Sequence, residues 1–179
     1  MDFRTHRLAG TATGLAIAGI ISPLEISTKS ILTYSLLIAG SYFGSYLPDI
    51  DEPQSKIGKC FPFLSRIIKK IGGHRGFMHS LTMAVILWGI LFSLQVEFFN
   101  PKYSYYLSLT VLAIITGFLS HLFIDSLTIS GVPWLWPLSS KKLSLGKLHT
   151  SNKFHQLLVR LLCLGVIGLS LYFRLWKIK

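Results

Sequence analysis

Hydrophobic residues fall into five long stretches that are separated by polar segments. The stretches cover residues 8–24, 31–47, 80–99, 105–124 and 156–176. Each has about the 17 to 25 residues that a tilted helix needs to cross the hydrocarbon core of a bilayer. The pattern predicts an all-α fold: one membrane-embedded domain over residues 1–179, built as a multi-pass bundle of about five transmembrane helices.

The composition agrees with a membrane protein. Of the 179 residues, 51% are hydrophobic and only 14% are charged, and the mean hydropathy is +0.54. This balance lies outside that of soluble globular domains. Arg4 and Arg7 before the first stretch also suit a secretory signal peptide, but the stretch is long for one and lacks a clear cleavage site.

Small residues in the first two stretches predict close helix packing. Gly10, Gly14 and Gly19 lie in the first stretch, and Gly40 and Gly44 lie four residues apart in the second. Glycine lets helix backbones approach each other, which favours association within lipid. The alternative is that glycine is simply frequent in membrane helices.

Basic residues predict the orientation. If all five stretches cross, most Lys and Arg residues fall on one side: before the first stretch, in the loop 48–79 and in the loop 125–155. Positive residues stay on the cytoplasmic side. We therefore expect an inner-membrane protein with its amino terminus and these loops in the cytoplasm.

The net charge of +11 has an explanation in the membrane itself. Basic residues near helix ends are attracted to anionic lipid headgroups, so the charge does not imply a nucleic-acid partner. Residues 55–70 alternate basic and apolar side chains, which predicts either an amphipathic helix in the membrane interface or an ordinary basic loop. Cys60 and Cys163 match no zinc-binding spacing and receive no function.

Potential metal ligands lie at the ends of four of the five stretches. They are His6 before the first, Asp49 and Asp51 after the second, His74 and His79 before the third, and His121 and Asp125 at the end of the fourth. In a serial crossing these ends share one membrane face, which the charge pattern makes cytoplasmic. Ionisable groups at this depth are costly unless they are paired or bind a metal.

Two of these pairs have informative spacing. His121 and Asp125 are four residues apart on a predicted helix, so both can reach one ion, although a packed His and a capping Asp would look the same. Pro48 should end the second helix, leaving Asp49 and Asp51 in an extended segment or a turn. The two carboxylates could then serve two ions, one could orient a His while the other binds metal, or both could belong to a simple turn.

The third pair lies around a glycine-rich segment. His74 and His79 are five residues apart and cannot face one ion from the same regular helix. Gly73 and Gly76 suggest a flexible turn that carries His74, with His79 in the first turn of the next helix. Arg75 in this turn could bind a phosphate, or could serve only as a cytoplasmic positive charge.

The ligand types indicate the metal. Imidazole and carboxylate groups without thiolates suit zinc, manganese or iron. Their number exceeds what one catalytic ion usually needs, which predicts a pair of divalent ions, with zinc the first expectation. Such a pair activates water and stabilises both oxygens of a displacement reaction.

Several motifs in series resemble one family. They are Thr5-His6, Leu47-Pro48-Asp49-Ile50-Asp51 with Ser55, Gly73-His74-Arg75-Gly76 with His79-Ser80, and Ser120-His121 through Asp125 with Thr128, Gly131-Val132 and Leu135-Trp136-Pro137. Over residues 5–138 the chain resembles the membrane-bound metal-dependent hydrolases, also described as LexA-binding, inner-membrane-associated hydrolases. Met78 departs from the threonine expected beside His79. The helix with His121 and Asp125 is also similar to part of the zinc-dependent phospholipase C enzymes.

The resemblance implies a multi-pass protein with a metal site built from these residues. The combined hypothesis is a membrane-embedded hydrolase that cleaves a phosphoester of a lipid or lipid-linked substrate at the cytoplasmic leaflet. The expected metal ligands are His6, Asp49, Asp51, His74, His79, His121 and Asp125. Asp51 could instead act as a base, and Arg75 would bind the substrate phosphate.

Two other classes remain open. The protein could be a non-enzymatic, metal-stabilised scaffold or regulator that recruits a cytoplasmic partner, in which case protein atoms would fill every coordination position. A metal or ion transporter would place its ionisable groups near the bilayer midplane. Here they cluster at one edge, which disfavours transport.

Overall fold

The computed structural model describes residues 1–21, 27–73, 75–98 and 100–178, and within these residues the fold is all-α. The α-helices are α1 (Phe3–Ile21), α2 (Thr28–Gly44), α3 (Lys56–Cys60), α4 (Pro62–Gly72), α5 (Leu81–Phe98), α6 (Ser104–Ser126) and α7 (Lys153–Ile178). Three short 3-10 helices join them: η1 (Pro48–Asp51), η2 (Phe77–His79) and η3 (Pro101–Tyr103).

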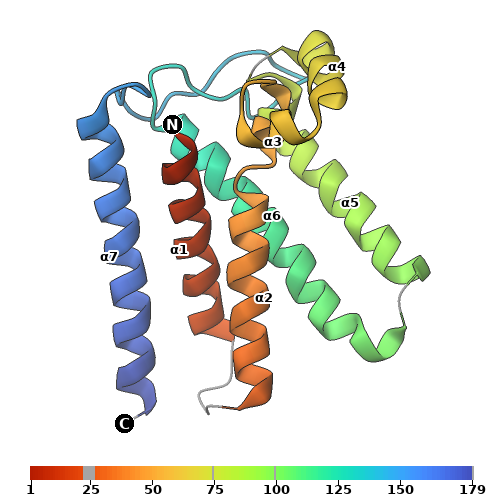
Figure 1. Ribbon diagram of the computed structural model, residues 1–179, viewed down its shortest axis with the longest axis vertical. Helices are drawn as coiled ribbons and strands as arrows, with labels where there is room; N and C mark the ends of the chain where they lie inside the picture. The colour runs from red at the N-terminus through yellow and green to blue at the C-terminus, as the bar shows by residue number, and fades with distance from the viewer. Residues whose placement is uncertain (22–26, 74, 99, 179) are drawn as a thin grey trace.

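Three of the described helices are long and apolar enough to cross a membrane. They are α5, α6 and α7, the last over Lys153–Trp176. Their bounds agree closely with the predicted stretches 80–99, 105–124 and 156–176. Figure 1 shows α7, α1 and α2 running side by side, while α6 and α5 both slope obliquely to these three helices.

The first two helices differ from the prediction. Helix α1 begins at Phe3 rather than at residue 8, so that Arg4, His6 and Arg7 lie inside its first turns. Helix α2 ends at Gly44, before Leu47, and has 17 residues. Polar residues at the start of α1 and the shortness of α2 make both less typical of spanning helices than α5, α6 and α7.

Close backbone contacts hold α2 between α1 and α6. A Cβ atom on Gly14 of α1 would lie 2.5 Å from the carbonyl oxygen of Leu37, and one on Gly44 of α2 would lie 2.0 Å from that of Ile114. On α6, a Cβ atom on Gly117 would lie 2.1 Å from the carbonyl oxygen of Ser41. Such contacts exist only where the side chain is a hydrogen atom, so the predicted packing role is confirmed for Gly10, Gly14, Gly40 and Gly44. It is not confirmed for Gly19, where a Cβ atom would meet no described atom within 4 Å.

Apart from η3, which joins α5 to α6 at the other end, the short elements gather at the end of the bundle where the amino terminus lies (Figure 1). The segment 55–70 forms two helices, α3 and α4, that meet at Phe61 because Pro62 begins α4. The loop after α6 crosses the same end, where Trp134 donates a hydrogen bond to Ser126 (2.7 Å) and packs on the core around Phe118. This end therefore holds the described segments that carry His6, Asp49, Asp51, His79, His121 and Asp125.

Candidate metal centre

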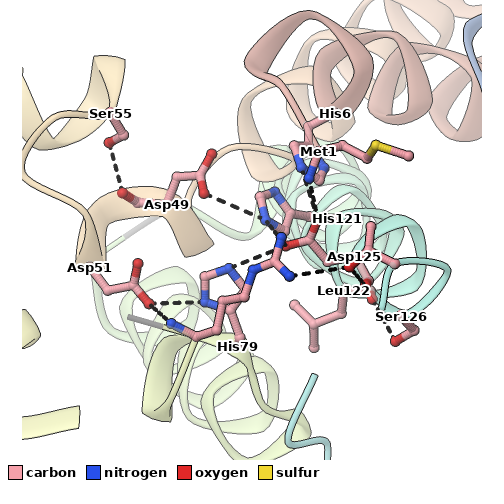
Figure 2. A network of polar contacts seen from close by, with 12 residues as sticks. Met1, His6, Asp49, Asp51, Ser55, His79, His121, Leu122, Asp125 and Ser126 are labelled. Carbon is pink, nitrogen blue, oxygen red and sulfur yellow. Dashed lines mark hydrogen bonds and ion pairs between the residues drawn. The ribbon is translucent and has the colours of Figure 1, made fainter. Parts of the chain in front are cut away.

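Side chains from four separate segments meet at this end of the bundle. His6 comes from α1, Asp49 from η1, His79 from η2, and His121 and Asp125 from α6. Figure 2 shows these five side chains directed toward one another. The segments are distant in sequence, and the packing of α1, α2 and α6 brings them together.

His121 is held by the backbone of the α2 end. Its Nδ1 lies 2.7 Å from the carbonyl oxygen of Ser45, and a carbonyl oxygen can only accept, so Nδ1 carries the proton. The other ring nitrogen, Nε2, presents its lone pair 3.7 Å from Asp49 Oδ1 and 3.8 Å from Asp125 Oδ2. Within the described part of the chain, this buried Nε2 has no hydrogen-bond partner.

Asp51 orients His79. Its Oδ2 accepts a hydrogen bond from Nδ1 of His79 (3.0 Å) and another from the backbone N–H of Arg75 (3.0 Å). His79 Nε2 then faces Asp125 Oδ2 at 3.9 Å. A carboxylate behind a histidine fixes its ring and raises its basicity as a metal ligand. Of the arrangements considered for the two carboxylates, the structure favours the one in which Asp49 faces the cluster and Asp51 orients a His. The segment that carries them is a 3-10 turn rather than an extended segment.

His6 lies on the other side of Asp125. Its Nε2 is 3.3 Å from Asp125 Oδ1, and its ring stacks on that of His121 with 3.7 Å between centroids. The two oxygens of Asp125 therefore face different imidazoles. Oδ1 faces His6 and lies 2.6 Å from the amino group of Met1, while Oδ2 faces His79 and His121.

These residues form two groups that could hold a metal ion. One contains His6, His121 and Asp125, the other Asp49, His79 and His121, and within each group the ligand atoms lie within 4.8 Å of one another. Ligands about 2.1 Å from one tetrahedral ion are roughly 3.4 Å apart. Four separations between an imidazole nitrogen and a carboxylate oxygen, 3.3 to 3.9 Å, are close to this spacing. The other ligand atoms of each group would have to move closer together where they approach the 4.8 Å limit.

Burial adds to the case for a cation. The side chains of His6, His79, His121 and Asp125 are at most 2% exposed, whereas that of Asp49 is 21% exposed. Burial raises the pKa of Asp49, although the nearby His6 and His79 oppose the shift. A carboxylate whose charged form is destabilised in this way gains from a bound positive ion.

Arg75 lies within the cluster rather than apart from it. Its Nη2 is 2.7 Å from Asp125 Oδ2, and its Nη1 donates to the hydroxyl of Thr128 (3.2 Å). The backbone of Arg75 has a φ of 57°, in the left-handed region that residues other than Gly, Asn and Asp rarely adopt. The hydrogen bond from its N–H to Asp51 helps to hold this strained turn. His74, the remaining predicted ligand, lies outside the described residues.

Sequence reasoning missed a second polar cluster that supports α1. Arg160 of α7 donates hydrogen bonds to the carboxylate of Asp2 and to the hydroxyl of Thr5 (3.1 Å). Asp2 also accepts from the backbone N–H of Thr5 (3.2 Å), as a helix-capping residue does. Burial raises the pKa of Asp2, but the hydrogen bonds from Thr5 and Arg160 outweigh it and leave that pKa below its usual value.

Replacing Arg160 by glutamine should loosen the first turn of α1. We expect a loss of about 1 kcal/mol of stability, because both charged groups are partly exposed. The double variant with Asp2→Asn should lose little more than either single variant, which thermal unfolding of the purified protein would measure. Fully additive losses would show that the two side chains do not interact.

The cluster and its scaffold can now be compared with known proteins. The model of the family described as YdjM inner membrane protein matches residues 1–177, which is nearly the whole chain. The chain belongs to the YdjM inner membrane protein family. This agrees with the resemblance seen in the motifs and, with three spanning helices, makes the chain a multi-pass inner-membrane protein.

Individual relatives cover less of the sequence. The inner membrane protein YdjM of Escherichia coli (strain K12) is 41% identical over 91 residues, which are 51% of this chain and 44% of that protein. YvsG of Bacillus subtilis (strain 168) is 34% identical over 102 residues, 57% of this chain and 58% of YvsG. The chain thus spans about half the length of the curated relatives it matches. No solved structure matches it.

Proposed function

We propose that this YdjM-family protein is a metal-dependent hydrolase that cleaves a phosphoester of a lipid or lipid-linked molecule at the cytoplasmic membrane face. One observation carries the proposal: imidazole nitrogens and carboxylate oxygens from η1, η2 and α6 converge within reach of a single ion. The hydrolase description of the family points the same way. The position of the cluster at one end of the spanning helices favours a substrate that reaches it from the headgroup layer (Figure 1).

The donor set suggests how ions would be held. His121 has one nitrogen available, since its other nitrogen donates to Ser45, so it can serve only one ion. Asp49, His79, His121 and Asp125 Oδ2 would complete a four-ligand site for zinc, the first choice, or for manganese or iron. A second ion between Asp125 Oδ1 and His6 would have to displace the amino group of Met1, which lies 2.6 Å from Oδ1.

The remaining residues have separate roles in the proposed reaction. A divalent ion acts as a Lewis acid that polarises a phosphoryl oxygen and makes water a nucleophile near neutral pH. Asp49 and Arg75, which are 21% and 10% exposed, mark the side from which substrate would enter. Arg75 would bind the phosphoryl group. Asp51 is fully buried behind His79, which favours an orienting role over that of a base.

We further propose that α1 and α2 also cross the membrane, giving five spans with the amino terminus and the metal centre in the cytoplasm. Helix α2 has 17 residues and is about 25 Å long, nearly the thickness of the hydrocarbon core. Helix α2 packs on α6, which is long and apolar enough to span, through glycine contacts, and α1 packs on α2 in the same way. The basic residues of the amino terminus and of the two longer loops support the orientation.

Hydrolysis should depend on metal and on Arg75. The purified protein should cleave bis-p-nitrophenyl phosphate or phosphatidic acid in micelles, lose activity with a chelator and recover it with zinc or manganese. Arg75→Gln should raise KM about tenfold or more, because a charged hydrogen bond to phosphate is lost, while Arg75→Lys should recover only part. Equal activity of the chelated and metal-loaded protein would contradict the proposal.

The burial of the cluster also favours a second candidate, a metal-stabilised scaffold. Four of its side chains are almost inaccessible, as in structural sites, whose coordination positions are all filled by protein. A scaffold would unfold at a lower temperature after metal removal, yet would hydrolyse none of these substrates. The same set of experiments therefore separates the two functions.

A further inference from the structure

Helix α4 carries an apolar face that no described part of the protein covers. Phe63, Ile67 and Ile71 recur every four residues and form one stripe along the helix, with Leu64 beside it. Phe63 is 76% exposed and Ile71 is 74% exposed. The helix has only 11 residues and is about 16 Å long, so the stripe cannot be explained by a membrane crossing.

The same helix is strongly basic. Arg66, Lys69 and Lys70 lie on its polar side, and it contains no acidic residue. An apolar stripe flanked by Lys and Arg is typical of helices that lie in the plane of a membrane surface. The charge also selects the lipid, since the basic side chains complement the phosphates of anionic headgroups.

The position of α4 places this stripe at the right depth. Figure 1 shows α4 at the end of the bundle where helix α5 begins and where the amino terminus also lies. That end of a spanning helix lies near the headgroup layer. The opposite side of α4 faces the protein, where Ser65 is fully buried.

Contacts on that protein-facing side connect α4 to the carboxylates of the metal centre. Lys69 pairs with Glu52 at 2.8 Å, directly after Asp51. Ser55 caps the neighbouring helix α3, and its hydroxyl donates to the carbonyl oxygen of Asp49 (2.7 Å). A Cβ atom on Gly58 of α3 would lie 2.1 Å from the carbonyl oxygen of Glu52, so α3 packs directly on the end of η1.

We propose that α4 is an interfacial helix that binds anionic lipids, with Phe63, Ile67 and Ile71 among the acyl chains and Arg66 and Lys70 on headgroup phosphates. The occupant of the exposed face is the bilayer, not a second protein. Through α3 and the Lys69–Glu52 pair, this lipid contact would steady the turn that carries Asp49. The inference does not depend on catalysis.

Spin-label accessibility tests the placement in the full-length protein. Cys60 and Cys163 are first replaced by serine, and a label is placed at Ile71→Cys or, as a matched control one residue away, at Lys70→Cys. In nanodiscs of phosphatidylglycerol, the label at position 71 should be accessible to oxygen and shielded from a water-soluble nickel complex. The label at position 70 should show the reverse. Equal exposure of both labels to the nickel complex would overturn the placement.

Lipid charge tests the second half of the proposal. The label at position 71 should lie deeper in phosphatidylglycerol than in phosphatidylcholine. The affinity of α4 for the anionic lipid surface should be about five- to thirtyfold higher, from about 1 kcal/mol for each of one or two basic residues. Arg66→Gln with Lys70→Gln should remove this difference, whereas Lys141→Gln with Lys142→Gln, the same charge change in another loop, should not. Identical depth in both lipids would refute the anionic contact. Dipolar broadening between labels of two molecules would show that a second copy covers the face instead.

Discussion

Replacing Asp125 by asparagine should abolish divalent-metal binding by the purified protein. Asp125 is the residue whose two oxygens face both sides of the cluster, Oδ1 toward His6 and Oδ2 toward His79 and His121. Asparagine keeps the shape of the side chain but removes the charge and one oxygen. We expect the affinity for the metal to fall by more than about 100-fold. Loss of a residue that only supports a metal ligand usually lowers this affinity by about 10- to 100-fold.

Asp51→Asn is the informative companion to this variant. Asp51 contacts Nδ1 of His79 rather than the converging ligand atoms, so its loss should weaken metal binding by about 10- to 100-fold without abolishing it. Glu97→Gln, an exposed acid-to-amide change at the far end of α5, should leave binding unchanged. The metal content of the three variants after equilibrium dialysis gives the comparison. Wild-type metal content in Asp125→Asn would remove this residue from the proposed site.

Alanine at Gly44 or Gly117 should strongly destabilise the bundle. The added methyl would lie 2.0 or 2.1 Å from a carbonyl oxygen of the facing helix, so α2 and α6 would have to separate by roughly 1 Å or more. We expect each substitution to cost about 1–3 kcal/mol or more. Metal affinity should fall as well, because the contact between α2 and α6 also positions the carbonyl oxygen of Ser45 to bind the ring of His121.

The matched control for these variants is Gly165→Ala in α7. A Cβ atom there would meet no other atom within 4 Å among the described residues, and alanine is a better helix former than glycine by about 1 kcal/mol. This variant should be as stable as the wild type or slightly more so. Thermal unfolding in detergent makes the comparison. Equal stability of all three variants would show that α2 and α6 do not pack as described.

The sequence predicts well those features that depend on long apolar runs. The ends of helices α5, α6 and α7 lie within a few residues of the predicted ends, because polar or helix-breaking residues stand on both sides of each apolar run. The convergence of His6, Asp49, His79, His121 and Asp125 at one end of the bundle agrees with the prediction that these ends of the stretches lie together. Their assignment as metal ligands stays a prediction.

The features that the sequence does not reveal depend on contacts between distant segments. Helix α1 starts early because Arg160, 158 residues from Asp2, helps to hold its first turn. Asp2 followed by Thr5 is a local capping signal that could have indicated this start. The carbonyl of Ser45 that orients His121 belongs to the backbone, so no side-chain pattern could identify it.

The roles of Asp51 and Arg75 could not be assigned from the sequence for a different reason. From the sequence, Asp49 and Asp51 are equivalent carboxylates two residues apart. The 3-10 turn of η1 separates them, and Asp51 is fully buried against His79 while Asp49 stays partly exposed. Arg75 has an unusual backbone conformation that only the surrounding contacts specify.

The most direct test of the metal centre is an anomalous-diffraction map at the zinc absorption edge, from crystals of the protein grown with zinc. The account predicts a peak about 2.0 to 2.2 Å from Nε2 of His79, Nε2 of His121 and the carboxylates of Asp49 and Asp125. A zinc-loaded crystal with no peak among these atoms would contradict it. So would a peak only elsewhere, for example at the neighbouring rings of His149 and His155.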